Sequence, residues 1–570
     1  MEPNQRYETD DKMPFLPGAY QPNQYMESGY NQFPGGPPID PKLSDFVNKY
    51  GVELSDGSVF LQDPKAKPPK KETNVLYPCG CTKIQFIIAI LLIILAIAAL
   101  IIGLSVGLTR SKRPNISFPP AKIWWKRSLI YQINIRTHAN DVGGPIGRLE
   151  DVVSRIPYYY HQVGALALLF TDLVEMDNYG VKNFKIVDPI IDPETKGTNL
   201  LMRLKEKANK PDGPRSQEPS IQLLLGLPLY ATSSSHEWFK QSVEMPGSKH
   251  GTYYIWRANA AYYRHTHGNK DQPLLNLEDV QVQMELDGII THWKDVLGIK
   301  GIEITNSTSY NLIPEMVPFM RNILLKQETQ DFVWFADDPE TDEALANANL
   351  CFARILIKSR FQKRSEELSA QLAKYQASQR FKNGCVRVWR VAVEDEGNPD
   401  SNIDYQSIMG LAYFLPGIYN MMSGQEVLIN DGNRVLMKWT DEDYLNYETY
   451  FPVNKVKTTS RQVLNKWVLL KNAIYRSSLL RSDPIDSPYS DLSNMVTSND
   501  VSIYKRTYTQ TDNAVIFMVS FSTLNIDGRL NSFLGPSAYV EFDSKNMYSH
   551  QILQLSVVKF TNNQIFLLFK

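Results

Sequence analysis

The strongest constraint on the fold is a repeated alternation of short apolar segments with longer amphipathic ones after Lys122. The segments SLIYQINI, ALALLF and IQLLLGL are short and almost wholly apolar, which is typical of buried strands. Between such segments lie stretches with helical spacing, for example VQMELDGIITHWKDVLG. Over about 350 residues this alternation predicts an α/β fold whose parallel strands close into a (β/α)8 TIM barrel.

The pattern changes near residue 490. From there on, the segments AVIFMVSFS, ILQLSVVKF and QIFLLF are separated by turn residues, and no helical stretch lies between them. Strands in this arrangement are typical of an antiparallel sheet. We therefore expect the barrel over residues 122–489 and a separate antiparallel β domain over residues 490–570.

An uncharged apolar run, Ile84–Leu108, precedes the barrel. As a helix with a rise of about 1.5 Å per residue it exceeds the roughly 30 Å of a bilayer core, so it predicts a transmembrane helix over residues 84–108. Residues 1–83 are polar and rich in proline and glycine, which predicts a disordered cytosolic tail, and residues 109–121 form a short extracellular neck. Small residues recur on one face of the predicted span and favour packing against another helix: Ala96, Ala99, Gly103 and Gly107.

Two glycosylation sequons follow the apolar run, at Asn115 and Asn306. Lysine and arginine are nearly balanced on the two sides of the run, so the sequons decide the orientation. They favour a single-pass type II glycoprotein of the plasma membrane with a cytosolic N-terminus, a signal-anchor span and an extracellular C-terminal domain.

Composition limits the partners and the cysteine chemistry. The net charge of −1 argues against a nucleic-acid partner, which usually requires a basic excess. Four cysteines in 570 residues exclude a disulfide-rich scaffold. Cys79 and Cys81, just before the apolar run, are either palmitoylated or inert, and Cys351 and Cys385 either pair or stay free. We expect neither a metal nor a cofactor.

The segment WWKRSLIYQINIR, residues 124–136, resembles the opening strand of the α-amylase superfamily, glycoside hydrolase family 13. Five further segments resemble that family in its order along the chain: IVDPIIDPETKGT, HEWF, YYIWR, QPLLNLEDVQVQ and GLAYFLPGIYNMMSGQE. The resemblance covers nearly everything after Lys122 and implies the same barrel. Only a short insert separates YYIWR from QPLLNLEDV, which implies that a full domain B is lacking.

The resemblance also locates the positions that carry catalysis in that family, which needs a carboxylate nucleophile and a carboxylic acid beside the scissile bond. On the strand Gly301–Thr305, Glu303 stands at the position of the family's arginine and Thr305 at that of its nucleophile, while the acid's position falls at Asp337. Other family motifs place the following residues at positions that are polar in active members: Gly226, Tyr230, Ala231, Pro399 and Asp400. A threonine without an adjacent base cannot replace an aspartate nucleophile. Because the nucleophile, its arginine and the family's Asn-His pair are lost together, the resemblance implies a pseudoenzyme rather than an enzyme.

An internal span followed by such a domain resembles the heavy subunits of heteromeric amino-acid transporters, the family of rBAT and the 4F2 heavy chain. This resemblance implies a non-catalytic heavy chain that associates with a multi-span light-chain permease and with membrane lipids. It would bring the permease to the cell surface and so enable amino-acid transport. The family's usual neck cysteine is absent from residues 109–121, so either the link to the light chain is non-covalent or the partner differs. Two alternatives stay open, namely a membrane-anchored adhesion or scaffold protein and a maltase-like ectoenzyme.

Overall fold

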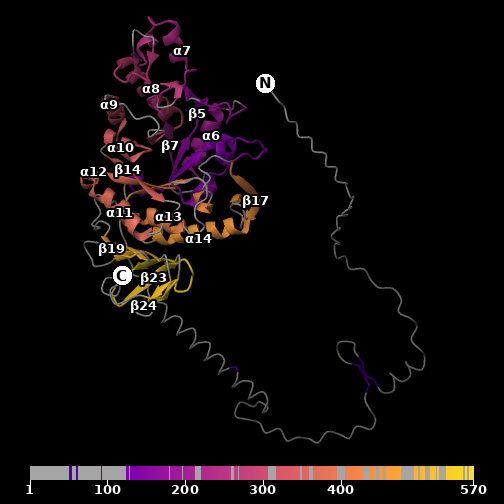
Figure 1. Cartoon of the computed structure of the whole chain (residues 1–570). Helices are drawn as coiled ribbons and strands as arrows, with labels where there is room; N and C mark the ends of the chain where they lie inside the picture. The colour runs from indigo at the N-terminus through magenta and orange to yellow at the C-terminus, as the bar shows by residue number, and fades with distance from the viewer. Residues whose placement is uncertain are drawn as a thin grey trace, which may run out of the picture. The chain divides into compact units, whose positions relative to one another are not determined.

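The computed structural model of the chain (Figure 1) divides it into two compact units, Met1–Ile101 and Ile102–Lys570. In the first unit, β1 (Gly51–Glu53) pairs antiparallel with β2 (Val59–Leu61). All the elements that follow belong to the second unit. The structure describes these residues: 51–53, 59–61, 92, 123–127, 129–178, 180–194, 197–211, 220–257, 262–266, 269–305, 316–346, 349–357, 364–393, 405–428, 436–444, 448–453, 457–476, 493–498, 501–507, 514–520, 523–525, 535–555, 559–561 and 564–569.

Several predicted features lie outside the described residues. They are the tail apart from β1 and β2, the span apart from Leu92, the neck, and these single residues: Cys79, Cys81, Ala96, Ala99, Gly103, Gly107, Asn115, Asn306, Pro399 and Asp400. Among the helices that the structure describes, none is both long and apolar enough to cross a membrane.

Eight parallel strands form the barrel: β3 (Leu129–Asn134), β4 (Ala167–Thr171), β7 (Gln222–Leu227), β12 (Gly301–Ile304), β13 (Val333–Ala336), β14 (Leu350–Ile357), β15 (Val386–Val393) and β16 (Ile418–Met422). They pair in the order β13-β12-β7-β4-β3-β16-β15-β14. The two ends of this order meet, because Phe335 of β13 stacks on Phe352 of β14 with 6.1 Å between the ring centroids. The predicted α/β barrel is therefore confirmed.

Helices and short helical turns connect the barrel strands (Figure 1). One example is α8 (Val280–Val296), which begins where the Asp279 side chain accepts a hydrogen bond of 2.7 Å from the backbone N–H of Gln281. Its buried residues recur at helical spacing: Val282, Leu286, Ile289, Ile290 and Trp293. The other connections contain α3 (Ile135–His138), α4 (Leu149–Ser154), α5 (Ile156–Tyr158), η2 (Tyr159–Val163), α6 (Gly197–Asn209), α7 (Glu237–Glu244), α9 (Val317–Gln327), α10 (Pro339–Leu345), α11 (Arg364–Ala377), α12 (Gln379–Lys382), α13 (Tyr405–Phe414), η6 (Gln425–Val427) and α14 (Lys457–Arg476).

Small antiparallel hairpins extend three of the connections. After β4, β5 (Val174–Met176) pairs with β6 (Val181–Val187). After β16, β17 (Lys438–Tyr444) pairs with β18 (Glu448–Val453). The described chain between β7 and α8 forms α7 and these short elements: η3 (Lys249–Thr252), β8 (Trp256–Arg257), β9 (Tyr262–Tyr263), β10 (His265–Thr266) and β11 (Asn269–Pro273).

The interior of the barrel changes character along its axis. Alternate strand residues point inward, and the first of them are apolar and form one cluster: Ile130, Ala167, Leu169, Leu224, Val333, Phe335, Phe352, Val388 and Ile418. The inward residues that follow on β3, β12, β15 and β16 are polar and buried, namely Gln132, Glu303, Arg390 and Asn420. The interior therefore becomes polar toward the carboxyl ends of the strands.

The C-terminal part is a six-stranded sheet, as the sequence pattern predicts. Its strands run in the order β19 (Ser493–Ser498), β20 (Val501–Thr507), β21 (Ala514–Ser520), β26 (Gln564–Phe569), β23 (Ser537–Asp543) and β24 (Ile552–Gln554), and every neighbouring pair is antiparallel. Phe517 of β21 stacks on Phe414 of α13 with 5.3 Å between the ring centroids. One face of the sheet thereby joins the core of the barrel unit.

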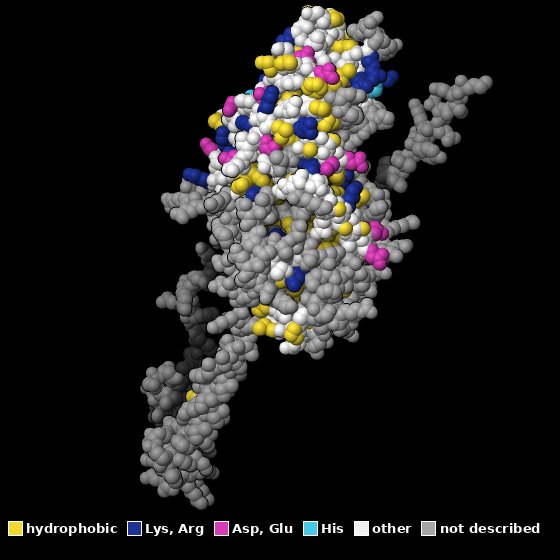
Figure 2. Space-filling view, turned by 90° about the vertical axis from the view of Figure 1, so that its left-hand side faces the viewer, with side chains coloured by type: hydrophobic (Ala, Val, Ile, Leu, Met, Phe, Trp, Pro, Cys, Tyr) yellow, Lys and Arg dark blue, Asp and Glu magenta, His cyan; other side chains and the backbone are white. Residues whose placement is uncertain are grey.

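A disulfide joins Cys351 of β14 to Cys385, which directly precedes β15. The sequence leaves this pairing open, because only the register of β14 with β15 brings the two thiols together. The bond closes a loop of sequence separation 34 that contains α11 and α12. On the molecular face drawn in Figure 2, basic and acidic side chains of the described residues are interspersed.

Candidate active site

The mouth of the barrel is polar and partly exposed. In (β/α)8 barrels the active site lies at the carboxyl ends of the strands. We use the term mouth residues for five partly exposed residues at those ends, together with Arg354 from within β14: Asn134, Thr171, Asp172, Thr305, Asp337 and Arg354. They come from five different strands, so a substrate at the mouth meets several elements at once.

Gly226 of β7 makes room for two threonines at the mouth. A Cβ atom on this glycine would lie 2.7 Å from Thr305 Cγ2 and 3.1 Å from Thr171 Cγ2. Tyr230 follows β7, is buried, and its hydroxyl donates a hydrogen bond of 3.0 Å to the Thr305 carbonyl. Ala231 is buried beside it. The structure thus brings these sequence-predicted positions together, with threonine methyl groups at the point where a side chain on Gly226 would lie.

Asp337 stands beside Thr305 at the end of the neighbouring strand. Its backbone N–H donates a hydrogen bond of 3.1 Å to the Ile304 carbonyl, and its own carbonyl accepts one of 2.8 Å from Arg354 Nη2. The same guanidinium lies 3.9 Å from the carboxylate of Asp338, whose side chain caps α10. The backbone of Asp337 is therefore held on both sides, while its side chain is partly exposed at the mouth.

Glu303 lies one inward position below Thr305 and is fully buried. Its Oε1 accepts a charged hydrogen bond from Arg390 Nη2, and that guanidinium also donates one of 2.7 Å to Gln132 Oε1. Burial raises the pKa of Glu303 to about 7, although Arg390 lowers it; the nearby Asp337 carboxylate raises it further. Glu303 Oε2 has no hydrogen-bond partner among the described residues. A carboxyl group that titrates near neutral pH thus lies directly beneath the mouth.

The sequence pattern does not single out a further acidic mouth residue, Asp172. This residue directly follows β4 and has a φ of +59°. The Asn134 side chain hydrogen-bonds to its carboxyl group; burial raises the pKa of Asp172, and the charge of Arg136 opposes that rise. Arg136 itself pairs with Asp188. The available signal is its place, since an aspartate directly after the buried strand ALALLFT faces the functional end of a parallel barrel.

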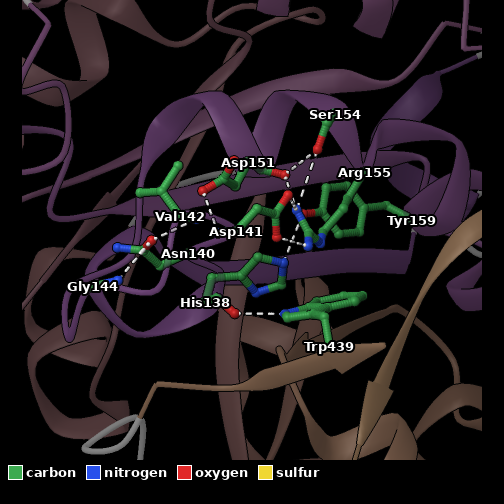
Figure 3. A network of polar contacts seen from close by, with 10 residues as sticks. All are labelled: His138, Asn140, Asp141, Val142, Gly144, Asp151, Ser154, Arg155, Tyr159 and Trp439. Carbon is green, nitrogen blue, oxygen red and sulfur yellow. Dashed lines mark hydrogen bonds and ion pairs between the residues drawn. The ribbon is translucent and has the colours of Figure 1, made fainter. Parts of the chain in front are cut away.

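A polar network beside the mouth joins the segment between β3 and β4 to the β17–β18 hairpin (Figure 3). Trp439 of β17 donates a hydrogen bond of 2.7 Å from Nε1 to the His138 carbonyl. The Arg155 guanidinium lies 4.6 Å from the centroid of the Trp439 ring and pairs with Asp141. His138 Nε2 lies 2.7 Å from the Tyr159 hydroxyl, and burial, assisted by the charge of Arg155, holds the pKa of His138 well below its usual value. The histidine is therefore neutral, and the network fixes the edge of the mouth rather than carrying charge into it.

No family model matches the chain. A glucan 1,6-alpha-glucosidase of Streptococcus dysgalactiae subsp. equisimilis is 25% identical over 195 residues, which is 30% of this chain and 34% of that protein. An alpha-amylase 3 of Dictyoglomus thermophilum is 24% identical over 195 residues, which is 32% of this chain and 36% of that protein. The chain thus spans about a third of the length of these curated relatives.

Solved structures match over their whole length. The alpha-glucosyl transfer enzyme XgtA superimposes with a TM-score of 0.57 at 14% identity, covering 79% of this chain and 100% of that one. A mutant of the trehalulose synthase MutB gives a TM-score of 0.58 at 14% identity with the same two coverages. The fold is that of an α-amylase-superfamily glycosidase. Such similarity establishes the α-amylase-type architecture of the barrel and its C-terminal sheet.

The α-amylase-type relatives contradict the expected function. They are named as glucosidases, an α-amylase and a glucosyl-transfer enzyme, and none of those described above is a transporter subunit. The predictions of a non-catalytic heavy chain, of amino-acid transport and of a pseudoenzyme are therefore wrong. They were based on the predicted span and on several substituted positions taken together, namely Thr305, Glu303 and the segment Gly226–Ala231, whereas carboxyl groups at other strand ends also face the α-amylase-type mouth.

The predicted single-pass location in the plasma membrane is contradicted as well. That prediction depended on the hydropathy of residues 84–108, which lie outside the described residues apart from Leu92. Among the described helices none can cross a membrane, and the α-amylase-type relatives carry the names of enzymes. The light-chain permease and membrane lipids as partners, and the lack of a nucleic-acid partner, stay untested predictions.

Proposed function

We propose that the chain is a carbohydrate-active enzyme that cleaves α-glucosides at the mouth of its barrel. The observation that carries the proposal is the placement of Asp337, a partly exposed carboxyl group on the strand next to Thr305 in an α-amylase-type barrel. The names of the relatives, which include a glucan 1,6-alpha-glucosidase and an oligo-1,6-glucosidase, support α-linked glucose units as the substrate class.

Cleavage of a glycosidic bond requires a proton for the leaving oxygen, because an alkoxide is a poor leaving group. Asp337 suits the role of proton donor, since its backbone is fixed by Ile304 and Arg354 while its side chain faces the mouth. The buried Glu303 below it cannot reach a sugar, but its charge lies close enough to interact with that of Asp337. Glu303 and Arg390 therefore act on the electrostatics of the mouth from beneath it.

Thr305 has no carboxyl group, so it cannot supply the second acidic function of a glycosidase. Its methyl group lies against Gly226, and its carbonyl accepts the Tyr230 hydroxyl. The second carboxyl group must therefore come from another strand end.

The proposed function also includes an assignment of the domains of the chain. We infer that the short insertion between β7 and α8 takes the place of a full domain B, and that the catalytic barrel occupies residues 122–489. The strands after residue 490 would then act as a supporting domain, since their sheet shares the contact of Phe517 with Phe414.

The proposal is tested by assaying the purified full chain on isomaltose, maltose and an aryl α-glucoside. We expect turnover of at least one of them, and a loss of kcat of about 100-fold or more in Asp337→Asn, which removes the proton donor. Asp331→Asn is the matched control, because Asp331 is an exposed aspartate that precedes the opposite end of the same strand. Binding without any turnover by the wild-type chain would refute the proposed function.

A further inference from the structure

The barrel closes between β13 and β14, which stand at the two ends of the strand order. A side chain from α10 bridges these two strands. Asp342 Oδ1 accepts a hydrogen bond of 3.1 Å from the backbone N–H of Ala336, and its Oδ2 accepts one of 2.9 Å from the N–H of Phe352. Ala336 is the last residue of β13 and Phe352 belongs to β14, so one carboxylate joins both strands at the closure.

The turn between β13 and α10 brings this carboxylate back to the strand. Asp338 caps the helix, since its side chain accepts hydrogen bonds of 3.1 and 3.0 Å from two backbone N–H groups of the first turn. Asp342 lies in that same turn and is buried. Asp337 lies between Ala336 and the cap, so the contacts on either side of it also fix the peptide that carries its side chain.

Arg380 of α12 holds the Asp342 carboxylate in place. Its Nη1 lies 2.7 Å from Asp342 Oδ2, and its Nη2 donates a hydrogen bond of 2.6 Å to the carbonyl of Leu350 at the start of β14. Burial raises the pKa of the Asp342 carboxyl group, while the charge of Arg380 and the two backbone donors oppose that rise. Charge-assisted hydrogen bonds are stronger than neutral ones, so these contacts fix the carboxylate relative to both strands.

We propose that Asp342 is the positioning residue that holds the proton donor Asp337 in place at the mouth. The inference rests on the proposed function and deepens it. Because Asp342 is buried, it acts through the N–H of Ala336 rather than on the substrate. Arg354 holds the same short segment from the other side, through the Asp337 carbonyl.

The expected size of the effect follows from the geometry of proton transfer. A general acid must lie within about 2.6–3.2 Å of the oxygen that it protonates. A displacement of about 1 Å can lower the rate about 100-fold. Release of the end of β13 would move Asp337 without removing its carboxyl group, so it would impair proton donation more than sugar binding.

The variant Asp342→Asn releases one strand selectively. Its amide keeps one acceptor oxygen and gains an NH2 group, which only donates. Phe352 and Arg380 both donate to Oδ2, so we expect the amide oxygen to take that side. The NH2 group then faces the N–H of Ala336, donor against donor, and the end of β13 loses its acceptor while α10 and β14 stay joined.

The test compares kcat/KM of the full-length wild type and of Asp342→Asn on maltose, isomaltose and 2,4-dinitrophenyl α-glucoside. Dinitrophenolate leaves without a proton, whereas the sugar oxygen of a disaccharide needs one. We expect kcat/KM to fall about 30-fold or more on the disaccharide that the wild type cleaves, and less than about threefold on the dinitrophenyl substrate. A merely structural role of Asp342 would lower both values equally.

Asp543→Asn is the matched control. Asp543 of β23 is also a buried aspartate, and it accepts hydrogen bonds from three backbone N–H groups of the C-terminal sheet at 2.9, 2.8 and 3.1 Å. We expect this variant to lower Tm and to leave kcat/KM unchanged on every substrate. If Asp342→Asn does not fold, Arg380→Lys keeps the charge but loses the double contact, and it should show the same difference between substrates at a smaller size.

The outcomes separate this inference from the proposed function. A loss that is large on the disaccharide and small on the dinitrophenyl substrate supports Asp342 as the positioning residue. In an active wild type, an equal loss on both kinds of substrate, or no loss, overturns the inference and leaves the proposed function standing. A wild type that cleaves only the dinitrophenyl substrate has no working proton donor and overturns the inference as well. A wild type that cleaves none of the substrates overturns both.

Discussion

Two buried glutamates, Glu303 and Glu426, are held in opposite ways. Glu303 points into the barrel, has one charged partner in Arg390, and leaves Oε2 without a partner among the described residues. Glu426 lies outside the barrel wall, where the hydroxyls of Tyr131 and Tyr158 donate to its Oε1 at 2.7 and 3.0 Å and the N–H of Gly424 donates to its Oε2 at 2.9 Å.

This difference gives the two glutamates different roles: Glu426 is structural, whereas Glu303 acts on the candidate site. Burial raises the pKa of both carboxyl groups. Both oxygens of Glu426 are occupied by neutral donors, so this glutamate ties β3, α5 and η6 together. Glu303 is incompletely satisfied and lies beneath the mouth, where its charge interacts with that of Asp337. Of these two glutamates, the one that is incompletely satisfied is therefore the one beneath the candidate site.

The largest expected effect is on stability, and it comes from replacing Glu426, whose carboxylate oxygens both accept hydrogen bonds. Glu426→Ala leaves two tyrosine hydroxyls and one backbone N–H without an acceptor, and we expect it to lower the free energy of unfolding by about 4 kcal/mol. Glu426→Gln is the control, because it keeps one acceptor oxygen. It should lower the free energy of unfolding roughly half as much as Glu426→Ala does. Urea unfolding followed by tryptophan fluorescence measures both. A cost for Glu426→Ala below 1 kcal/mol would remove the contrast between the two glutamates.

The next effect concerns the charged partner of Glu303. Arg390→Met leaves Glu303 buried and unpaired, and we expect a loss of about 3 kcal/mol near pH 8. Near pH 5 the loss should be smaller, because Glu303, with its pKa raised to about 7, is then neutral. The double variant Glu303→Leu with Arg390→Met should be close to the wild type in stability, since both charges are gone. Equal losses for Arg390→Met at the two pH values would show that the pair is not ionic.

The smallest effect is the pH dependence of the wild type itself. The pKa of Glu303 is raised from 4.5 to about 7 in the folded chain, so between these values the folded state binds the proton more tightly than the unfolded state. The stabilisation is complete below pH 4.5 and is lost as the pH rises through 7. From pH 5 to pH 7 this amounts to about 2 kcal/mol.

Urea unfolding of the wild type and of Glu303→Gln at several pH values measures that contribution. The glutamine cannot titrate. The difference between the two proteins in how steeply the free energy of unfolding changes with pH therefore isolates the contribution of Glu303 from that of Glu426 and every other acidic group. If the free energy of unfolding of Glu303→Gln changes with pH as steeply as that of the wild type, the pH dependence arises from groups other than Glu303.

The sequence alone predicts much of the frame of the site. Gly226, Thr305 and Asp337 fall at strand ends because the apolar segments before them are recognisable by composition and length. The structure brings these residues together at the mouth, where Gly226 faces Thr305 and Asp337 stands beside it. The interpretation of Thr305, Glu303 and the segment Gly226–Ala231 together as the mark of an inactive site was wrong, because substitutions at some strand ends say nothing about carboxyl groups at the others.

The partners of these residues could not be predicted in the same way. Arg390 is 87 residues from Glu303, and Glu426 is 295 residues from Tyr131, so no local spacing connects them. Among the described aspartates, Asp172 differs through its φ of +59°, which is a property of the folded turn. The disulfide between Cys351 and Cys385 likewise depends on the register of two strands.

The sequence by itself determined the alternation of strands and helices, the change to an antiparallel sheet and the identity of the residues at most strand ends. These follow from the hydrophobic period, which is a local property of the chain. The tertiary structure alone decided which side chains meet inside the barrel and which buried carboxyl group is fully satisfied. Those features arise only when the eight strands close, because closure brings distant segments within the few ångströms over which hydrogen bonds and charges act.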